Sequence, residues 1–325
     1  MQQIEITAHE AGQRFSKMLE KYLNEAPKSF IYKMLRKKNI TLNGKKASGN
    51  EKLVVGDQVR LFLADETICK FSRQEIPGDT GELAIIYEDD QVLFINKPVG
   101  LLSQKAAPTD ISVVEYIIGY LYASGQLTET KLRSFHPGIC NRLDRNTSGI
   151  MAAGKTITGL QEMGKLFSAR TLKKYYLCVV KGVVTEASYI SGYLIKDEKT
   201  NHVSVCREQT AGSLPIETEY VPVAAGEEYT LLNVHLITGR AHQIRAHLAS
   251  VGHPLAGDYK YGCRLANEQL KQMYGLKSQL LHAYRIELPQ ECGALKQLAG
   301  RVFTAEPPEL FKKIAKDVTD GNLEF

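Results

Sequence analysis

The spacing of apolar residues predicts two short helices and a hairpin within the first 63 residues. Two sets of apolar side chains recur at intervals of three and four, as on the buried face of an amphipathic helix. The sets are Ala11, Phe15, Met18, Leu19, Tyr22 and Leu23, and then Ile31, Met34 and Leu35. Residues 40–42 and 59–63 are strand-like, and Asn43-Gly44 between them is a strong hairpin turn signal. We therefore expect a small α/β unit at the N-terminus.

From residue 82 onward the apolar pattern changes to a series of strands with few helices. Strands are expected at residues 85–87, 92–95, 150–153, 175–180, 189–195, 202–206, 217–223, 229–237 and 280–288. Helices are expected at residues 112–124, 160–167, 241–250 and 308–317. The strands follow one another as hairpins and do not alternate with helices, which favours an α+β fold around a mostly antiparallel mixed β-sheet.

Residues 64–81 separate these two parts. The segment lacks apolar periodicity and contains Pro77 and two glycines, so we interpret it as a linker. A chain of 325 residues is long enough for two domains. The expected organisation is a small domain at 1–63, the linker, and a larger domain at 82–325.

Composition narrows the class of protein. With 43% hydrophobic and 24% charged residues, the chain is typical of a soluble globular protein. No apolar run approaches the ~20 residues that span a bilayer, and the N-terminus has no apolar signal core, so we expect a cytoplasmic protein without a membrane partner. The six cysteines are scattered with no C-x-x-C pair, which argues against a disulfide framework and a zinc site.

The positive charge is concentrated in the first fifth of the chain. Residues 1–63 contain 12 Lys or Arg and 6 Asp or Glu, whereas the remaining residues contain 29 and 30. A basic module attached to a nearly neutral body suggests a polyanionic partner. The alternative is a basic face that serves solubility alone.

The stretch NRLDRNTSG, residues 141–149, carries the main candidate chemistry. Asp144 lies between Arg142 and Arg145 and is followed by small, turn-forming residues. Guanidinium groups favour the charged form of a nearby carboxylate, so we expect an ionised Asp on a tight loop, which can act as a nucleophile. A purely structural Asp–Arg ion pair at a turn is the alternative.

Three other patterns carry less weight. Residues 149–156 match the phosphate-loop pattern G-x-x-x-x-G-K-[ST], but apolar residues lie inside the match, where a strand is expected, so we predict no nucleotide cofactor. His242 and His247 are five residues apart, about 140° around a helix, and cannot share a metal-binding face. His242 and Arg245, three residues apart, lie on the same face of the helix. Ser148 is not within G-x-S-x-G, so a hydrolase nucleophile is unsupported.

Five motifs, in this order, resemble the RluA family of RNA pseudouridine synthases. They are YEDDQVLFINKPVG, RLDRNTSG, KKYYLCVVKG, LITGRAHQIRAHLASVGHPLAGDYKYG and LLHAYRIEL. The match runs from about residue 82 to residue 288. The resemblance implies an isomerase that acts on uridines in RNA and needs neither a cofactor nor a metal.

The resemblance also implies roles for single residues. Asp144 occupies the position of the aspartate that starts cleavage of the glycosidic bond. Tyr176 matches the tyrosine that stacks on the base and is a candidate for removing the C5 proton, and Arg245 matches the basic partner of the aspartate. Arg142 matches the arginine that fills the space of the displaced base, and Asn141 stands where histidine is usual.

Residues 12–63 resemble the S4 RNA-binding module in the order of their elements and in the LNGKKA…VVGDQV pattern. The resemblance implies RNA-backbone contacts by the basic helix end and hairpin. Arg240, at the basic start of the helix expected at residues 241–250, is a further candidate RNA contact outside this module. The residues of the helix end and hairpin are Arg36, Lys37, Lys38, Lys45 and Lys46.

Family members with an S4 module often modify large-subunit ribosomal RNA, so the expected activity is isomerisation of specific uridines to pseudouridine in large-subunit (23S) ribosomal RNA. A second hypothesis is an RNA-binding or ribosome-assembly factor on the same fold with catalysis weakened or lost. Asn141 is the feature that supports this second hypothesis.

Overall fold

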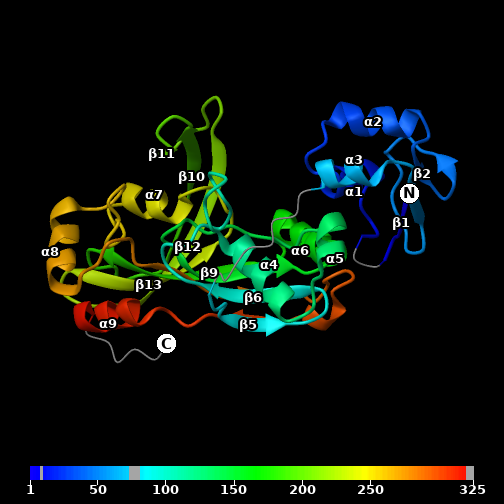
Figure 1. Cartoon of the computed structure of the whole chain (residues 1–325). Coiled ribbons are helices and arrows are strands. Elements are labelled where there is room, and N and C mark those ends of the chain that lie inside the picture. The colour runs from blue at the N-terminus through cyan, green and yellow to red at the C-terminus, as the bar shows by residue number, and fades with distance from the viewer. Residues whose placement is uncertain (8–9, 73–80, 320–325) are drawn as a thin grey trace.

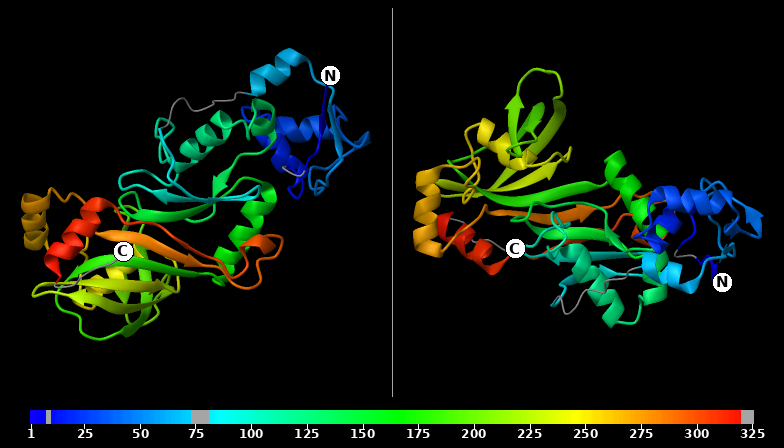
Figure 2. Two further views of the ribbon diagram at one scale, coloured as in Figure 1. Left: turned by 90° about the horizontal axis from the view of Figure 1, so that it is seen from below. Right: turned by 45° about the horizontal axis from the view of Figure 1, so that its top comes forward.

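A computed structural model describes residues 1–7, 10–72 and 81–319, and these residues form two sheets with their own cores (Figure 1). The N-terminal sheet has four strands, and the second sheet has eleven. In two further views the smaller unit packs at one end of the larger one (Figure 2). No helix among the described residues is long and apolar enough to cross a membrane.

The N-terminal unit is an antiparallel sheet in the order β1-β4-β2-β3 with helices packed against it. Its elements are β1 (Gln2–Glu5), α1 (Phe15–Tyr22), α2 (Lys28–Arg36), β2 (Ile40–Leu42), β3 (Lys45–Lys46), β4 (Gln58–Leu61) and α3 (Asp65–Phe71). The predicted apolar faces of both helices are buried, and the hairpin turn lies at Asn43-Gly44, both with positive φ. This arrangement fits the expected S4-like unit.

Helix α3 corrects the predicted linker. Residues 64–81 were expected to be irregular, but α3 lies within them and buries Ile68 in the N-terminal core. Phe71 at its end packs on Phe30 with ring centroids 4.8 Å apart. The apolar residues of this single short helix are too few for a visible repeat, so the pattern was missed. Residues 73–80 of the predicted linker lie outside the described residues.

The larger sheet is antiparallel except where β8 pairs with β14 in parallel. Its path is β11-β10-β12-β13-β9-β14-β8-β6-β5, with β15 beside β14 and β7 beside β8. The strands are β5 (Ile85–Glu88), β6 (Val92–Lys97), β7 (Gly138–Ile139), β8 (Ser148–Gly154), β9 (Lys173–Lys181), β10 (Ser188–Asp197), β11 (His202–Cys206), β12 (Leu214–Ala225), β13 (Tyr229–Leu236), β14 (Leu281–Glu287) and β15 (Val302–Thr304). The predicted α+β class with a mostly antiparallel sheet is confirmed.

Helices cover both faces of this sheet. They are α4 (Val113–Ala123), α5 (Glu129–Ser134), α6 (Ile157–Ala169), α7 (Gln243–Ser250), α8 (Arg264–Tyr274) and α9 (Glu309–Val318), with a short 3₁₀ turn at Lys296–Leu298. Alternate residues of β9 face different cores: Tyr176 and Cys178 join α4, α6 and α7, whereas Leu177 and Val179 join α8 and α9. Helices α5 and α8 were not predicted.

The two units are joined by direct contacts near α5. The Ser134 hydroxyl donates to the buried carboxylate of Glu10 at 2.7 Å, and the Gln13 amide donates to the Ser134 carbonyl at 3.4 Å. The Lys21 ammonium lies 5.7 Å from the centre of the Phe135 ring. These contacts hold the basic unit against the larger one.

Residues 149–154 of the phosphate-loop pattern form part of strand β8 and not a loop. Residues 149–154 of that pattern lie in the middle of the sheet, and every residue of β8 is buried. Gly149 has φ +113°, and a Cβ there would lie 2.2 Å from the Ala283 carbonyl oxygen. Only glycine permits β8 to approach β14 so closely. The loop before β8 therefore lies next to the start of β14, where Leu281 lies.

Candidate active site

Asp144 lies on the loop between β7 and β8, where backbone contacts fix its position. The Thr147 N–H donates to the Asp144 carbonyl at 3.0 Å and closes a tight turn. The buried Lys97 ammonium donates to the carbonyls of Pro98, Leu101 and Arg145 at 2.9, 2.9 and 3.0 Å. Burial lowers the pKa of Lys97 to about 8, although the Asp144 charge acts in the opposite direction. The loop thus presents a carboxylate whose side chain is 28% exposed.

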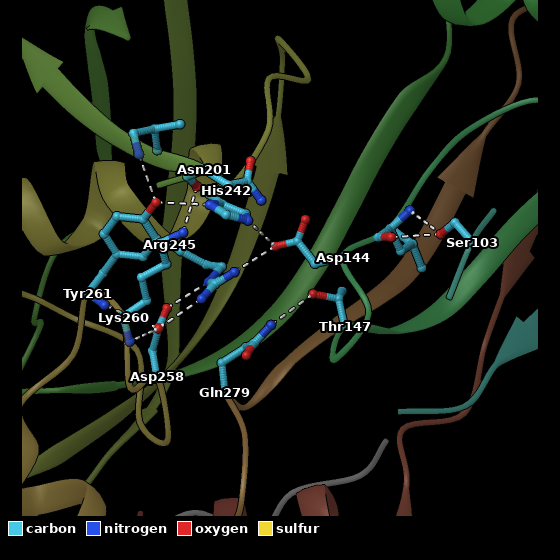
Figure 3. A network of polar contacts seen from close by, with 12 residues as sticks. Ser103, Asp144, Thr147, Asn201, His242, Arg245, Asp258, Lys260, Tyr261 and Gln279 are labelled. Atoms are coloured by element: carbon cyan, nitrogen blue, oxygen red, sulfur yellow. Dashed lines mark hydrogen bonds and ion pairs between the residues drawn. The ribbon is translucent and has the colours of Figure 1, made fainter. Parts of the chain in front are cut away.

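Arg245, on the first turn of α7, is the direct partner of Asp144. Its Nη1 donates to Asp144 Oδ2 at 2.9 Å (Figure 3). Asp258 holds the other edge of the guanidinium, with Nε to Oδ2 at 2.7 Å and Nη2 to Oδ1 at 2.9 Å. Burial alone would lower the pKa of Arg245, but the two carboxylates raise it above its ordinary value. The arginine is therefore a fixed positive charge beside Asp144.

Tyr176 reaches the same place from β9. Because side chains alternate along a strand, Tyr176 faces α7 and the cleft, while Tyr175 lies on the opposite face, stacked on His235 with ring centroids 4.9 Å apart. Burial, and then the Asp144 charge, raise the pKa of Tyr176 above its ordinary value. The phenol is therefore protonated near neutral pH, which suits packing against a base better than removal of a proton.

These residues line a cleft of about 560 Å³ in which cations outnumber acids. The cleft contains Arg142, Arg170, Lys174, Arg240 and Arg245, and Asp144 is its one carboxylate among the described residues. Lys174 lies beside Gly239, and burial together with the Arg170 charge lowers its pKa to about 8. The Arg240 Nε is buried without a hydrogen-bond partner among the described residues. Such a cleft suits an anionic ligand.

The structure brings together five of the ten residues assigned to the site from the sequence: Asp144, Tyr176, Arg245, Arg142 and Arg240. The other five lie on the N-terminal unit, where all are exposed: Arg36, Lys37, Lys38, Lys45 and Lys46. Arg36 ends α2 and β3 pairs with β2, so the basic residues follow one another around a single helix–hairpin connection. They form a second cationic surface, separate from the cleft.

Asn141 holds the candidate loop against β8. Its amide oxygen accepts from the Ala152 N–H at 2.8 Å, and its amide nitrogen donates to the Ile150 carbonyl at 3.5 Å. The side chain therefore stabilises the backbone just before Asp144 and lines one wall of the cleft. This contact gives no reason to expect a distorted site.

Asp258, His242 and Tyr261 were not assigned roles from the sequence. All three lie inside the motif LITGRAHQIRAHLASVGHPLAGDYKYG, one of the five motifs that resemble the RluA family. His242 Nε2 lies 3.8 Å from Asp144 Oδ2, and its Nδ1 lies 2.9 Å from the Tyr261 hydroxyl. Asp258 directly follows a glycine in a loop, and Arg245 lies earlier in the same motif. This combination of a carboxylate and an arginine was the sequence signal that could have identified Asp258.

No group of three or more His, Cys, Asp or Glu side chains in the described part of the chain is arranged to hold a metal ion. His247, considered in the sequence as a metal ligand, instead shares a hydrogen bond of 3.0 Å with the Thr218 hydroxyl. The chemistry available here is that of a carboxylate held by a guanidinium, in a cationic cleft, with an aromatic wall. Such a carboxylate can attack an electrophilic carbon of an anionic ligand.

Comparison with known proteins gives consistent matches. A family described as RNA pseudouridylate synthase matches residues 91–250. The chain is 31% identical over 299 residues to "Ribosomal large subunit pseudouridine synthase C" of Vibrio parahaemolyticus, covering 88% of each chain, and 30% identical to the protein of that name from Escherichia coli, covering 86% of each. The solved structure of human "RNA Pseudouridylate Synthase Domain Containing 4" has a TM-score of 0.56 at 23% identity, covering 70% of this chain and 90% of that one, and shows a common fold.

Proposed function

The chain belongs to the RNA pseudouridylate synthase family, and from this premise we propose that it isomerises specific uridines of large-subunit ribosomal RNA with Asp144 as its nucleophile. The enzyme is an isomerase, and RNA is its partner. The relatives at 30–31% identity are named as synthases of the ribosomal large subunit, which supports this RNA as the substrate. The observation that carries the role of Asp144 is its pairing with Arg245 inside a cationic cleft.

The proposed reaction rearranges one bond. An Asp144 carboxylate oxygen bonds to C1′ of the ribose as the C1′–N1 bond breaks and the uracil leaves with the electron pair on N1. The uracil turns so that C5 faces C1′, and the C1′–C5 bond forms as the carboxylate leaves. C5 then loses its proton and N1 gains one, so the product is an isomer of the substrate. Arg245 holds the negative charge of Asp144 before attack and after release.

A uridine within folded RNA must be flipped out before Asp144 can reach it, at a cost of a few kcal/mol. We assign this step to residues at the rim and the wall of the cleft. Arg142 is exposed at the rim, where a guanidinium can stack in the vacated space. Tyr176 offers an aromatic face for the flipped base, and Arg240 a positive charge for a phosphate.

The N-terminal unit is assigned to RNA docking. The five exposed cations of its helix–hairpin connection contribute to the positive excess of residues 1–63 and can bind the backbone of structured RNA. We propose that residues 1–63, now extended by α3, form an S4-like domain and that residues 82–325 form the catalytic domain. Since ribosomal RNA is the proposed substrate, the cytoplasm is the expected location.

The alternative function, RNA binding without catalysis, rested on Asn141. That side chain binds the backbone of β8 through both its amide oxygen and its amide nitrogen, and Asp144, Arg245 and Tyr176 still line one cleft. No other feature of the described residues favours the alternative.

Release of tritium from RNA labelled at uridine C5 tests the proposal, because the C5 proton leaves only when pseudouridine forms. Purified protein should release tritium from large-subunit ribosomal RNA and much less from small-subunit ribosomal RNA or tRNA. Release from tRNA alone would contradict the proposal that large-subunit ribosomal RNA is the substrate. No release from any of the three RNAs would contradict catalysis. A map of the pseudouridines lost when the protein is removed from its host would then identify the uridine.

A further inference from the structure

Two side chains approach the same oxygen of Asp144. Arg245 Nη1 lies 2.9 Å from Oδ2, and His242 Nε2 lies 3.8 Å from the same atom. No described residue forms a hydrogen bond or ion pair with Oδ1. The carboxylate is therefore held by one oxygen while the other is unpaired in the cleft (Figure 3). The roles assigned so far to Asp144, Tyr176 and Arg245 leave the position of His242 unexplained.

Tyr261 determines how His242 is held. The Tyr261 oxygen accepts from the Val203 N–H of β11 at 3.0 Å and lies 2.9 Å from His242 Nδ1. The hydroxyl proton can then be donated to Nδ1, which leaves the ring proton of a neutral histidine on Nε2, facing Asp144. The other neutral tautomer would direct the lone pair of Nε2 at a carboxylate. The hydrogen bonds and the electrostatics thus select the same tautomer.

We propose that Tyr261 is a positioning residue for catalysis, whose hydroxyl holds His242 as an Nε2–H donor to Asp144 Oδ2 and so leaves Oδ1 free to attack C1′. This inference rests on the proposed function. The distance of 3.8 Å is long for a hydrogen bond, but such bonds often shorten only when substrate fills the site. Tyr261 itself acts through His242 and does not touch the reacting atoms.

Tyr261 is well suited to this role because its own position is fixed. Asp258 Oδ1 accepts from the backbone N–H groups of Lys260 and Tyr261 at 2.9 and 3.2 Å, so the loop is built on the carboxylate that anchors Arg245. The Tyr261 ring lies 5.2 Å from the Arg245 guanidinium carbon. One side chain therefore contacts both partners of Asp144.

The backbone conformation of His242 is consistent with a functional role for its side chain. Its φ of 53° and ψ of 16° are in the left-handed region, which is uncommon for a residue other than glycine. Placed at the N-cap of α7, it forms no side-chain cap, and its ring is directed at Asp144 and Tyr261. The charged groups around the ring are Asp144, Asp258, Arg245 and Lys260, and the ring of Tyr261 contacts it edge-on.

Tyr261→Phe keeps the ring and removes the hydroxyl, and Tyr259→Phe on the same loop is the matched control, since the side chain of Tyr259 is exposed. Single-turnover tritium release should fall about tenfold in Tyr261→Phe, with the dissociation constant for RNA changed less than about twofold. Tyr259→Phe should match the wild type. Melting temperatures of both variants would show that each is folded.

A double-mutant cycle separates positioning from general packing. His242→Asn tolerates the left-handed backbone but cannot reach Asp144. If Tyr261 acts through His242, adding Tyr261→Phe to His242→Asn should cause little further loss of rate. The proposal would be overturned if the rate loss of the double variant equalled the product of the two single losses. A Tyr261→Phe enzyme with the wild-type rate would also overturn it.

A spectroscopic measurement remains informative even if the protein isomerises no tested RNA. ¹⁵N NMR of histidine-labelled protein should show His242 protonated on Nε2, and Tyr261→Phe should give a mixture of tautomers. A His242 signal protonated on Nδ1 in the wild type would overturn the inference. If the wild-type protein released no tritium from any tested RNA, that result would instead contradict the proposed function.

Discussion

At the scale of single residues, Asp258 determines where the Arg245 charge lies. Asp258 is fully buried and binds two nitrogens on one edge of the guanidinium, whereas Asp144 binds one nitrogen. Without Asp258, the arginine would be free to turn toward Asp144 and occupy its second oxygen. The sequence predicted the Asp144–Arg245 pair through its motifs but gave no role to Asp258. The contact depends on the course of the loop after α7, which local patterns do not encode.

Asp258→Asn should therefore slow catalysis and destabilise the fold. Breaking a buried charge pair leaves a charge uncompensated, so the free energy of unfolding should fall by about 3 kcal/mol. Single-turnover tritium release and urea unfolding would measure both effects, with the exposed Asp90→Asn as a control. A variant as stable and as active as the wild type would show that Arg245 needs no second carboxylate.

At the scale of elements, the close approach of β8 and β14 places the Asp144 loop. Gly149 packs against the Ala283 backbone with positive φ, and no side chain fits there. The sequence predicted the strand at 150–153 correctly and separated it from a phosphate loop, because apolar residues occupied the expected loop. Helices α5 and α8 were missed. Helix α5 has six residues, and α8 buries only Ala266, Asn267 and Leu270, too few for a clear pattern.

Gly149→Ala should prevent folding or lower the free energy of unfolding by more than about 4 kcal/mol, because its Cβ would collide with backbone atoms that cannot move aside. Gly164→Ala is the matched control, since nothing lies within 4 Å of a Cβ there and the residue is inside helix α6. That control should stabilise the protein by ~0.5–1 kcal/mol. If chemical unfolding showed the same change in stability for Gly149→Ala and Gly164→Ala, the close approach of β8 and β14 would be contradicted.

His282 on β14 should make the protein less stable in acid. The Ser148 hydroxyl donates to its Nδ1 at 2.9 Å, and its Nε2 donates to the Ala305 carbonyl at 2.8 Å. Burial lowers the pKa of His282 to about 4, although the bond to Ala305 acts in the opposite direction. The unfolded chain binds this proton near pH 6.5, so stability is full above pH 6.5 and is lost as pH falls toward 4.

The loss attributable to His282 is about 3 kcal/mol over that interval. Unfolding in urea at pH 7 and at pH 4.5, in wild type and in His282→Gln, would measure it. The variant should be less stable at pH 7 but should lose less stability on acidification. An identical loss in both proteins would show that His282 is not responsible.

At the scale of the whole molecule, two cationic surfaces are held in one arrangement. One is the cleft, and the other is the exposed helix–hairpin connection of the N-terminal unit. The charge asymmetry of the sequence indicated the second surface. The contacts of Glu10 and Gln13 with Ser134 could not be predicted, because they join residues more than a hundred positions apart. They fix the basic surface relative to Asp144 and thus favour RNAs that reach both.

Replacing Arg36, Lys37 and Lys38 with glutamine should weaken RNA binding and reduce its dependence on salt. Each phosphate contact releases bound counterions, so the slope of log K against log salt should become shallower by about 2. A matched control replaces three exposed lysines of the larger unit, Lys277, Lys313 and Lys316. Filter binding at several salt concentrations measures both. An unchanged slope in the first variant would contradict the docking role.

Nucleophilic attack by Asp144 is tested most directly by single-turnover tritium release in Asp144→Asn, with Asp90→Asn as the control. The amide keeps the shape of the side chain but lacks the negative charge that the proposed attack on C1′ requires. We predict no tritium release above the protein-free level, together with a dissociation constant for RNA within about threefold of the wild-type value. Release by Asp144→Asn at a rate close to that of the wild type would contradict the assignment of Asp144 as the nucleophile.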